Sequence, residues 1–235
     1  MVRKAVVLDC DPGVDDALAI ALALASPELR LLAITTTHGN APVSQGTENA
    51  LRVLEVLRRG GLPERHLPPV YQGSAHPLKR ARGAVNLTAL DVHGGDGLGG
   101  ISRKLDRMGR PLSPPPSLKK EREGAISALL RIAEREGKRL TVIATGPLTN
   151  LARALRVSGS PLRGVREIIL MGGTAMEPGN ASPVAEFNIF CDPEAAREVF
   201  SSGVPITMVG LDVTRKVLLR REQLKGGKGL FRFLR

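Results

Sequence analysis

The stretch KAVVLDCDPGVDDA, at residues 4–17, decides the fold of this chain. It opens with a short β-branched run at 4–9, which predicts a buried strand, and it turns at Asp11-Pro12-Gly13. Residues 14–25 (VDDALAIALALA) then have a helical composition, and Ser26-Pro27 ends the expected helix. A strand, a turn and a helix in direct succession form the first half of a βαβ unit.

The same alternation continues along the chain. We expect further strands at 29–36, 139–144, 165–171 and 205–209, and further helices at 43–59, 118–136 and 193–202, with another that begins at Leu148. Strands that alternate with helices predict right-handed crossovers and a mostly parallel β-sheet with helices on both faces. We therefore predict a single Rossmann-like α/β domain over residues 1–235. The Gly-rich stretch at 73–100 lacks this pattern, which favours a functional lid or a disordered segment.

Composition limits the class of protein. No apolar run reaches transmembrane length, the N-terminus lacks the apolar region of a signal peptide, and the two cysteines, Cys10 and Cys191, fit a reducing compartment. We therefore expect a cytoplasmic protein with no membrane partner. The net charge of +11 would suit a nucleic-acid partner, but residues 215–235 alone hold eight basic residues and one acidic residue. We expect no nucleic-acid partner, because no recognition motif or aromatic platform accompanies the charge.

Polar residues follow the carboxyl ends of the predicted strands. They are Asp9 and Asp11 at the end of the first strand, Asn40 after the second, Thr145 after 139–144, and Asn180, Glu186 and Asn188 after 165–171. Ligands of open α/β sheets bind at this edge, so we expect these dispersed residues to converge on one active-site cleft at the carboxyl ends of the strands.

Four carboxylates, Asp9, Asp11, Asp15 and Asp16, lie within eight residues of one another. Crowded carboxylates repel one another and raise one another's pKa, and a divalent cation removes that penalty. No Cys/His cluster lies nearby, so the cation should be hard, either Ca²⁺ or Mg²⁺. As an alternative, Asp15 and Asp16 would only stabilise the N-terminus of the helix that follows.

The string DCDPGVDDA, at residues 9–17, resembles the signature of the inosine–uridine-preferring nucleoside hydrolases. Later segments resemble the family in order and spacing: AITTTHGN (33–40), ATGPLTN (144–150), LMGG (170–173), GNASPVAEFN (179–188), CDPEA (191–195) and VGLDVT (209–214). The resemblance implies the nucleoside hydrolase fold, a homodimer or homotetramer, and hydrolysis of the N-glycosidic bond of ribonucleosides to free base and ribose.

The resemblance also implies how the metal and the catalytic groups are arranged. Asp11 and Asp16 resemble the carboxylates that bind Ca²⁺, and Thr145 would add its backbone carbonyl. Asp11 resembles the general base that takes a proton from Ca²⁺-bound water, whose pKa the ion lowers. His93 resembles a catalytic residue that lies on a mobile loop beside the nucleobase. Alternatively, His93 is a solvent-exposed side chain in a Gly-rich loop.

For the ribose, the resemblance implies five binding residues. Asp15 and Asn188 would bind the 2′- and 3′-hydroxyls, Asn40 would lie beside them, and Asn180 and Glu186 would hold the 5′-hydroxyl. Such a ring of oxygens favours the positive charge of an oxocarbenium-like transition state. Asn180 and Asn188 could equally be turn residues.

The sequence departs from the family at its C-terminal end. Family members continue past the region that matches 231–235, with a His-Asp-Pro segment that supplies another Ca²⁺ ligand and a base-side His. This sequence has no His after His93 and no Asp after Asp212, for which we expect a structural role. We expect a C-terminally incomplete domain, so a catalytically impaired nucleoside- or Ca²⁺-binding homologue is an alternative.

A more distant alternative is a haloacid-dehalogenase-like Mg²⁺ phosphatase. Such enzymes also begin with a strand and Asp-x-Asp, which Asp9 and Asp11 would supply, and they use an aspartyl nucleophile. The residues from Pro12 to Asp16 do not fit that pattern, and the later segments have no place in it.

Overall fold

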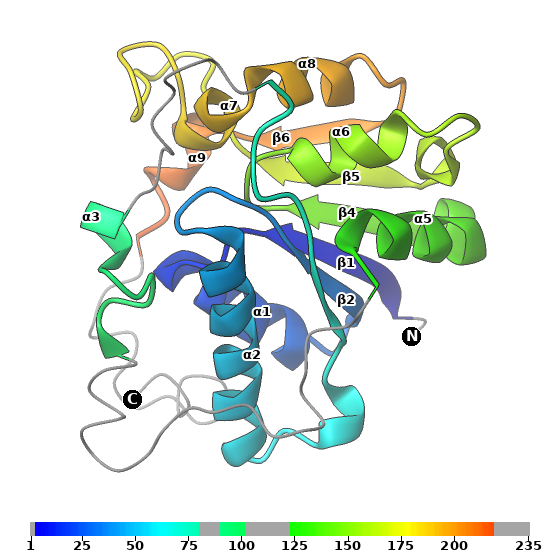
Figure 1. Cartoon of the computed structure of the whole chain (residues 1–235), viewed down its shortest axis with the longest axis vertical. Coiled ribbons are helices and arrows are strands. Elements are labelled where there is room, and N and C mark those ends of the chain that lie inside the picture. The colour runs from blue at the N-terminus through cyan, green and yellow to red at the C-terminus, as the bar shows by residue number, and fades with distance from the viewer. Residues whose placement is uncertain (1–2, 80–89, 102–122, 219–235) are drawn as a thin grey trace.

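Six parallel strands form the sheet in the computed structural model, which describes residues 3–79, 90–101 and 123–218. The strands are β1 (Lys4–Cys10), β2 (Leu29–Thr36), β3 (Val70–Gln72), β4 (Leu140–Ala144), β5 (Glu167–Met171) and β6 (Ile206–Val209). They lie in the order β3-β2-β1-β4-β5-β6 (Figure 1). The predicted α/β domain with a parallel sheet is confirmed.

Helices cover both faces of this sheet. The α-helices are α1 (Val14–Ala25), α2 (Val43–Arg59), α3 (Leu90–His93), α5 (Ala125–Glu136), α6 (Thr149–Leu155), α7 (Phe187–Cys191), α8 (Pro193–Phe200) and α9 (Leu211–Thr214). Short 3-10 turns, η1 (Glu64–His66), η2 (Gly137–Arg139) and η3 (Pro161–Gly164), connect them. Successive residues of a strand point to opposite faces, so Leu8 packs with α1 and α2 whereas Val7 packs with α5, α6 and α8.

The order of the strands reverses between β1 and β4. From β1 the chain runs outward through β2 to β3, and it then returns to β4 on the other side of β1. Asp9 is in register with Ala144, and the next residue, Thr145, donates its backbone N–H to the Asp9 carbonyl at 2.8 Å. The turns after β1 and β4 therefore emerge side by side, at the type of switch point where α/β sheets bind ligands.

The predicted elements agree best with the structure in its N-terminal half. α1, β2 and α2 have the bounds that the sequence predicts. The helix expected at 118–136 is α5, which begins at Ala125; residues 118–122 lie outside the described part of the chain. The expected strand at 139–144 begins one residue later, since η2 takes up Arg139.

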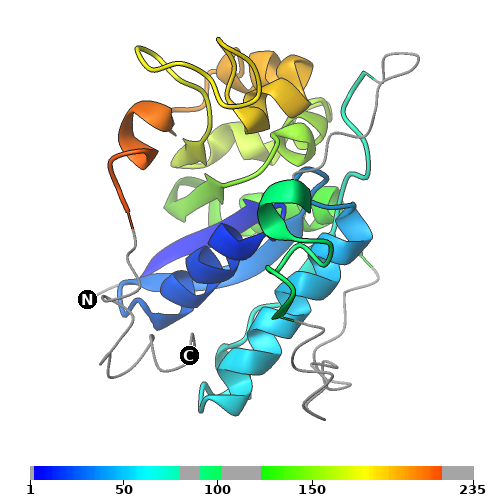
Figure 2. The same cartoon turned by 90° about the vertical axis from the view of Figure 1, so that its left-hand side faces the viewer.

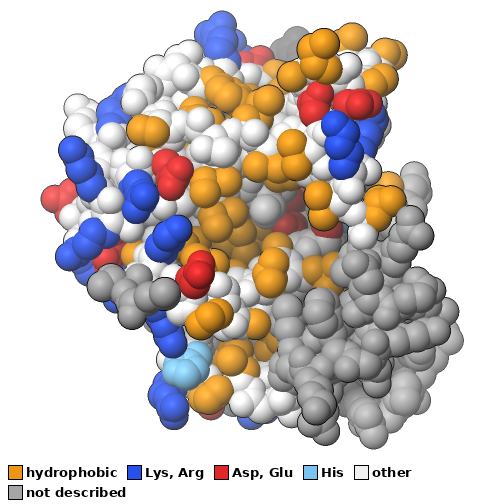
Figure 3. All heavy atoms as spheres, turned by 180° about the vertical axis from the view of Figure 1, so that it is seen from behind, with side chains coloured by type: hydrophobic (Ala, Val, Ile, Leu, Met, Phe, Trp, Pro, Cys, Tyr) orange, Lys and Arg blue, Asp and Glu red, His pale blue; other side chains and the backbone are white. Residues whose placement is uncertain are grey.

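The two halves of the sheet are covered unequally. In β5, Ile168 and Leu170 are buried in the core that α6 and α8 share, whereas Ile169 between them is only half-buried. In the neighbouring β6, Met208 is 40% exposed. On the rear of the molecule, hydrophobic side chains gather around a hollow (Figure 3).

Among the described residues, no helix is both long enough and apolar enough to cross a membrane.

Candidate active site

Asp11 lies at the centre of the edge formed by the carboxyl ends of the strands. Its side chain is 1% exposed, and its Oδ2 accepts the backbone N–H of Asn40 at 2.7 Å. The Asn40 amide nitrogen donates in turn to the Asp11 carbonyl at 3.1 Å. A Cβ atom on Gly39 would overlap Oδ2, and one on Gly146 would lie 2.7 Å from Oδ1. Glycines at the ends of β2 and β4 therefore leave the space that the Asp11 carboxylate fills.

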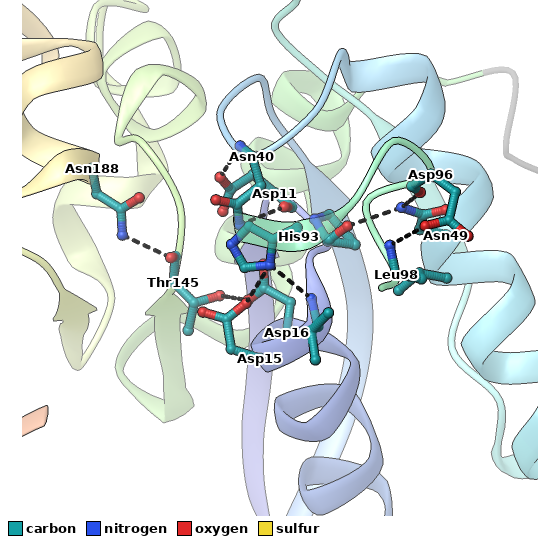
Figure 4. Close-up of polar contacts among 12 residues, drawn as sticks. Asp11, Asp15, Asp16, Asn40, Asn49, His93, Asp96, Leu98, Thr145 and Asn188 are labelled. Atoms are coloured by element: carbon teal, nitrogen blue, oxygen red, sulfur yellow. Dashed lines mark hydrogen bonds and ion pairs between the residues drawn. The ribbon is translucent and has the colours of Figure 1, made fainter. Parts of the chain in front are cut away.

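Asp16 reaches the same edge from the first turn of α1. It is 2% exposed, and its Oδ1 accepts the Thr145 hydroxyl at 2.6 Å, which joins α1 to the end of β4. The neighbouring Asp15 points the other way, with 76% of its side chain exposed. One acidic pair thus supplies a buried carboxylate and an exposed one to the same site (Figure 4).

Asp11 and Asp16 form a site suited to a hard cation. Burial, together with the charge of Asp16, raises the pKa of Asp11 well above its usual range. Burial and the nearby Asp15 raise the pKa of Asp16 to about 7. Asp11 Oδ1 and Asp16 Oδ2 are buried without a hydrogen-bond partner among the described residues, which is unfavourable for carboxylate oxygens. A divalent cation would satisfy both oxygens.

The ligand set in this part of the chain is small. Within the described ranges, no group of three or more His, Cys, Asp and Glu side chains is arranged to hold a metal ion. The residues that fit a cation are Asp11, Asp16 and the Thr145 carbonyl, all of which offer oxygen. That chemistry fits Ca²⁺ or Mg²⁺ better than a softer metal.

Asp9, the first of the four predicted carboxylates, lies in a separate network beside α6. It is fully buried, and burial raises its pKa to about 6. Its Oδ1 accepts the Thr35 hydroxyl and the Asn150 amide at 2.8 Å. Asn150 also donates to the Thr36 carbonyl at 2.9 Å and accepts the Ser74 N–H at 2.9 Å. Asp9 thus joins β1 to its surroundings through Oδ1, while its Oδ2, like Asp11 Oδ1 and Asp16 Oδ2, is buried without a partner among the described residues.

Glu186 and Asn188 form a wall of the site beyond β4 and β5. The Asn188 amide nitrogen donates to the Thr145 carbonyl at 2.8 Å and to the Met171 carbonyl at 3.1 Å. The Glu186 carboxylate caps the N-terminus of α7 by accepting the N–H groups of Asn188 at 2.9 Å and Ile189 at 3.1 Å. It also accepts the N–H of Gly173, after β5, at 3.0 Å. The two side chains therefore fix the backbone that follows β5.

Asn180 lies farther along the same loop and is exposed. Its side-chain oxygen accepts the Phe187 N–H at 2.8 Å, which ties this part of the loop to the first residue of α7. Asp212 supports the loop from α9, where the N–H groups of Ala175, Met176 and Glu177 lower its pKa to about 2. The expected structural role of Asp212 fits these contacts.

His93 packs on the N-terminus of α1. Its Nδ1 accepts the Val14 N–H at 3.2 Å and lies 3.8 Å from Asp15 Oδ1. The residue is only 9% exposed, so the alternative of a solvent-exposed side chain does not hold. Gly13, the N-cap residue of α1, has no side chain to accept this N–H, and the imidazole takes that place (Figure 4).

Most predicted site residues are joined by direct contacts. The contacts pair Asp11 with Asn40, Asp16 with Thr145, Thr145 with Asn188, Asp15 with His93, and Glu186 with Asn188. Asn180 is linked to them through backbone groups, the N–H of Phe187 and the carbonyl of Ala185.

Three further polar residues around the site were not predicted from the sequence. Asn150 and Asn49 are fully buried, and a polar residue on the apolar face of a helix is the signal that could have found them. His38 Nε2 lies 2.9 Å from the Thr149 hydroxyl oxygen. That hydroxyl donates to the buried Asp192 carboxylate at 2.6 Å. His38 follows no pattern that sequence reasoning could use.

Known proteins resemble this chain over nearly its whole length. The sequence model of the inosine-uridine preferring nucleoside hydrolases matches residues 6–233. The pyrimidine-specific ribonucleoside hydrolase RihA of Shewanella sp. (strain MR-7) is 42% identical over 94% of the chain. Uridine nucleosidase 1 of Arabidopsis thaliana is 40% identical over the same share. The chain spans 63% of the first relative and 60% of the second.

The solved structures that this chain resembles are of the same kind of enzyme as its sequence relatives. The purine-preferring ribonucleoside hydrolase from Gardnerella vaginalis superposes with a TM-score of 0.82 at 38% identity. The match covers 94% of this chain and 65% of that one. The names of these relatives include pyrimidine-specific and purine-preferring enzymes, so the resemblance does not select one class of base.

Proposed function

This chain belongs to the inosine-uridine preferring nucleoside hydrolase family, and we propose that it hydrolyses the N-glycosidic bond of ribonucleosides to free base and ribose. The observation that carries the proposal is the pair of buried carboxylates at the switch point of the sheet. Asp11 and Asp16 each keep one unpaired oxygen there, within the described residues, and the exposed Asp15 stands beside them.

We propose Ca²⁺ as the cation, held by Asp11, Asp16 and the Thr145 carbonyl. The unpaired oxygens of the two carboxylates support this choice, because oxygen ligands suit a hard cation. When bound, the ion would offset the carboxylate charges and make a nearby water more acidic.

Asp11 is the general base in this proposal. Asn40 holds the Asp11 carboxylate through Oδ2, and this oriented carboxylate takes the proton of the attacking water. The C1′–N bond breaks as the water attacks, and the nucleobase departs with the bonding electrons and takes up a proton, which balances the proton that Asp11 accepts. The surrounding carboxylates stabilise the positive charge that develops on the ribose.

Five residues bind the ribose in this proposal. Asp15 and Asn188 bind the 2′- and 3′-hydroxyls, with Asn40 beside them, and Asn180 and Glu186 bind the 5′-hydroxyl. A carboxylate or amide oxygen accepts more than one hydrogen bond, so Glu186 and Asn180 can bind a hydroxyl while they hold their backbone donors. His93, beside Asp15, acts on the side of the leaving base.

The setting of the enzyme is part of the same proposal. The cysteines of the described residues, Cys10 and Cys191, are free and buried, which supports the reducing cytoplasm as its location. We propose a homodimer or homotetramer that acts on a small-molecule nucleoside.

Release of free ribose from inosine, uridine, cytidine and adenosine tests the proposal. We expect release in the presence of Ca²⁺, none with a chelator, and a loss of about a thousandfold in kcat for Asp11→Asn, because the base is removed while its shape is kept. Glu198→Gln is the matched control, since Glu198 pairs with Arg156 on the surface. Its activity should equal that of the unmodified chain.

Calorimetric titration with Ca²⁺ and inosine separates the remaining outcomes. A folded chain that binds both but releases no ribose is the catalytically impaired homologue, and the proposed hydrolysis is then wrong. Equal activity of Asp11→Asn and the unmodified chain would exclude Asp11 as the base.

A further inference from the structure

Asn49 is a buried residue of α2 that the proposed mechanism does not use. It is fully buried, and its amide nitrogen donates to the carbonyls of Pro12 at 3.1 Å and Asp96 at 3.0 Å. Its side-chain oxygen accepts from Gln45 at 3.0 Å and from Arg52 at 3.1 Å. Two acceptors face the nitrogen and two donors face the oxygen, so the orientation of the amide is fixed by chemistry. One side chain thus joins the turn after β1 to residues 90–101 (Figure 4).

Residues 90–101 form a compact loop with its own internal bonds. Gly97 donates to the Gly94 carbonyl at 2.8 Å, and Gly99 donates to the His93 carbonyl at 2.7 Å. The Asp96 carboxylate accepts the N–H groups that follow, from Leu98 at 2.9 Å and Gly100 at 2.8 Å. The glycines at 94, 97, 99 and 100 have φ between +68° and +79°, a range that favours glycine.

This loop, which we call the 90–101 segment, contacts the site at two points. At one end, His93 accepts the Val14 N–H, and a Cβ on Gly13 would lie 2.7 Å from its Nδ1. At the other end, the Asp96 carbonyl accepts from Asn49, and a Cβ on Gly97 would lie 2.8 Å from the Asn49 nitrogen. The segment lies across the N-terminal ends of α1 and α2 (Figure 2).

We propose that Asn49 is a positioning residue, which holds the 90–101 segment, and with it His93, against the turn that carries Asp11. Alanine at this position would leave the carbonyls of Pro12 and Asp96 without their shared donor. The segment would then dock in a smaller fraction of molecules. Only the effect on catalysis rests on the proposed function, since docking is a property of the free protein.

Docking can be measured without any substrate. The chain contains no Trp, so Val92→Trp places a single reporter beside His93 at a side chain that is 78% exposed. In that background, Asn49→Ala should lower the fluorescence anisotropy of the reporter. In the chain without the reporter, Asn49→Ala should raise the rate of amide hydrogen exchange at Gly97 and Gly99 about tenfold. That factor corresponds to the loss of one buried hydrogen bond.

Gln45→Ala is the matched control, because Gln45 contacts the oxygen of the same amide and not the segment. It should leave anisotropy and exchange unchanged. Gly97→Ala provides a second route if Asn49→Ala unfolds α2, because its added methyl group meets the Asn49 nitrogen from the segment side. It should raise exchange in the segment while the melting temperature stays within about 2 °C of the unmodified chain.

Kinetics supply the readout that a merely structural role would not change. If only the docked state binds nucleoside, KM rises by the factor by which the docked fraction falls, while kcat stays within about twofold at saturation. That factor is at most the factor of about ten expected for exchange, and it reaches ten only where the undocked state predominates. Exchange and anisotropy in Asn49→Ala that match those of Gln45→Ala would overturn the proposal. A chain that hydrolyses no nucleoside would refute the proposed function, and the exchange and anisotropy results would still decide whether Asn49 docks the segment.

Discussion

Two regions border the active site, and they are held in place by opposite means. The first, which we call the floor, consists of Asp9, Asp11, Asp16, Thr145 and Asn150. Its contacts join side chains 129 and 141 residues apart in sequence, namely Asp16 with Thr145 and Asp9 with Asn150. The second is the 90–101 segment, in which the described hydrogen bonds join near neighbours. It meets the rest of the site through His93, which accepts the Val14 N–H, and through Asp96, whose carbonyl accepts from Asn49.

The difference teaches which part of the site depends on global folding. Contacts that join β1, β4 and α6 form only when the sheet is assembled, so the floor should be as stable as the whole domain. The 90–101 segment can release its two docking points while the sheet stays intact, which is how local opening arises in folded proteins. In the proposed function, Asp11 thus lies in the rigid region, whereas His93 lies in the less stable one.

The substitution Gly39→Ala should have the largest effect on this contrast. A methyl group there would overlap the Asp11 carboxylate, and φ at Gly39 is +153°. We expect the free energy of unfolding to fall by about 4 kcal/mol, from overpacking and backbone strain together. Urea unfolding followed by circular dichroism measures it.

Gly99→Ala is the matched substitution in the 90–101 segment. Its φ is +68°, and its added Cβ would only contact Val14 at 3.8 Å. We expect local strain with less than about 0.5 kcal/mol change in global stability, because the segment opens separately. Equal losses from the two alanines would refute the contrast between floor and segment.

Asn150→Ala tests the part of the floor beneath Asp9. It removes bonds to Asp9, Thr36 and Ser74 and leaves buried groups without partners. We expect a loss of about 3 kcal/mol in unfolding free energy. Ser74→Ala is the control, because the Ser74 hydroxyl is buried with no partner in the described part of the chain, so its removal should change stability by less than about 0.5 kcal/mol. A destabilised Ser74→Ala variant would mean that the hydroxyl has a partner.

His38, which lies outside the floor beside Thr149 of α6, should make the free energy of unfolding depend on pH. Burial lowers the pKa of His38 to about 4. The charge of Asp192 opposes this shift, whereas His76 and Arg153 add to it. The folded protein therefore binds a proton less readily than the unfolded chain, whose His titrates near 6.5. The contribution of neutral His38 is complete above pH 6.5 and declines as the pH falls toward 4.

His38→Gln isolates this contribution, because every other titrating group is common to both proteins. From about pH 7 to about pH 4.5, the unmodified chain should lose about 2 kcal/mol more unfolding free energy than the variant. Parallel urea titrations at several pH values measure the difference. Identical pH dependence in the two proteins would show that His38 is protonated as readily in the fold as in the unfolded chain.

Local patterns predicted the elements around the N-terminal part of the sheet. The helix at 14–25 ends at Ser26-Pro27 and the helix at 43–59 ends at Gly60-Gly61, and both have the predicted bounds. The three-residue strand β3 was not predicted, because it follows Pro68-Pro69 and pairs with β2 alone. So short an edge strand leaves no periodic pattern in the sequence.

Convergence of the polar residues was also predictable, but their contacts were not. Parallel strands bring their carboxyl ends to one edge, so Asp11, Asn40 and Thr145 had to meet there. Nothing local indicated that Asn188 donates to the Thr145 carbonyl or that Asp9 belongs to a separate network with Asn150. Those partners come from elements distant in sequence, which only the assembled sheet brings together.

The sequence by itself determined the alternation of strands and helices, the parallel sheet and the edge at which the carboxylates gather, because periodicity and turn chemistry are local properties. Tertiary structure alone decided which carboxylate oxygens stay unpaired, where His93 docks, and which buried amide joins the 90–101 segment to the site. Burial and hydrogen-bond pairing depend on what packs against each group, and the sequence does not specify those neighbours until the chain has folded.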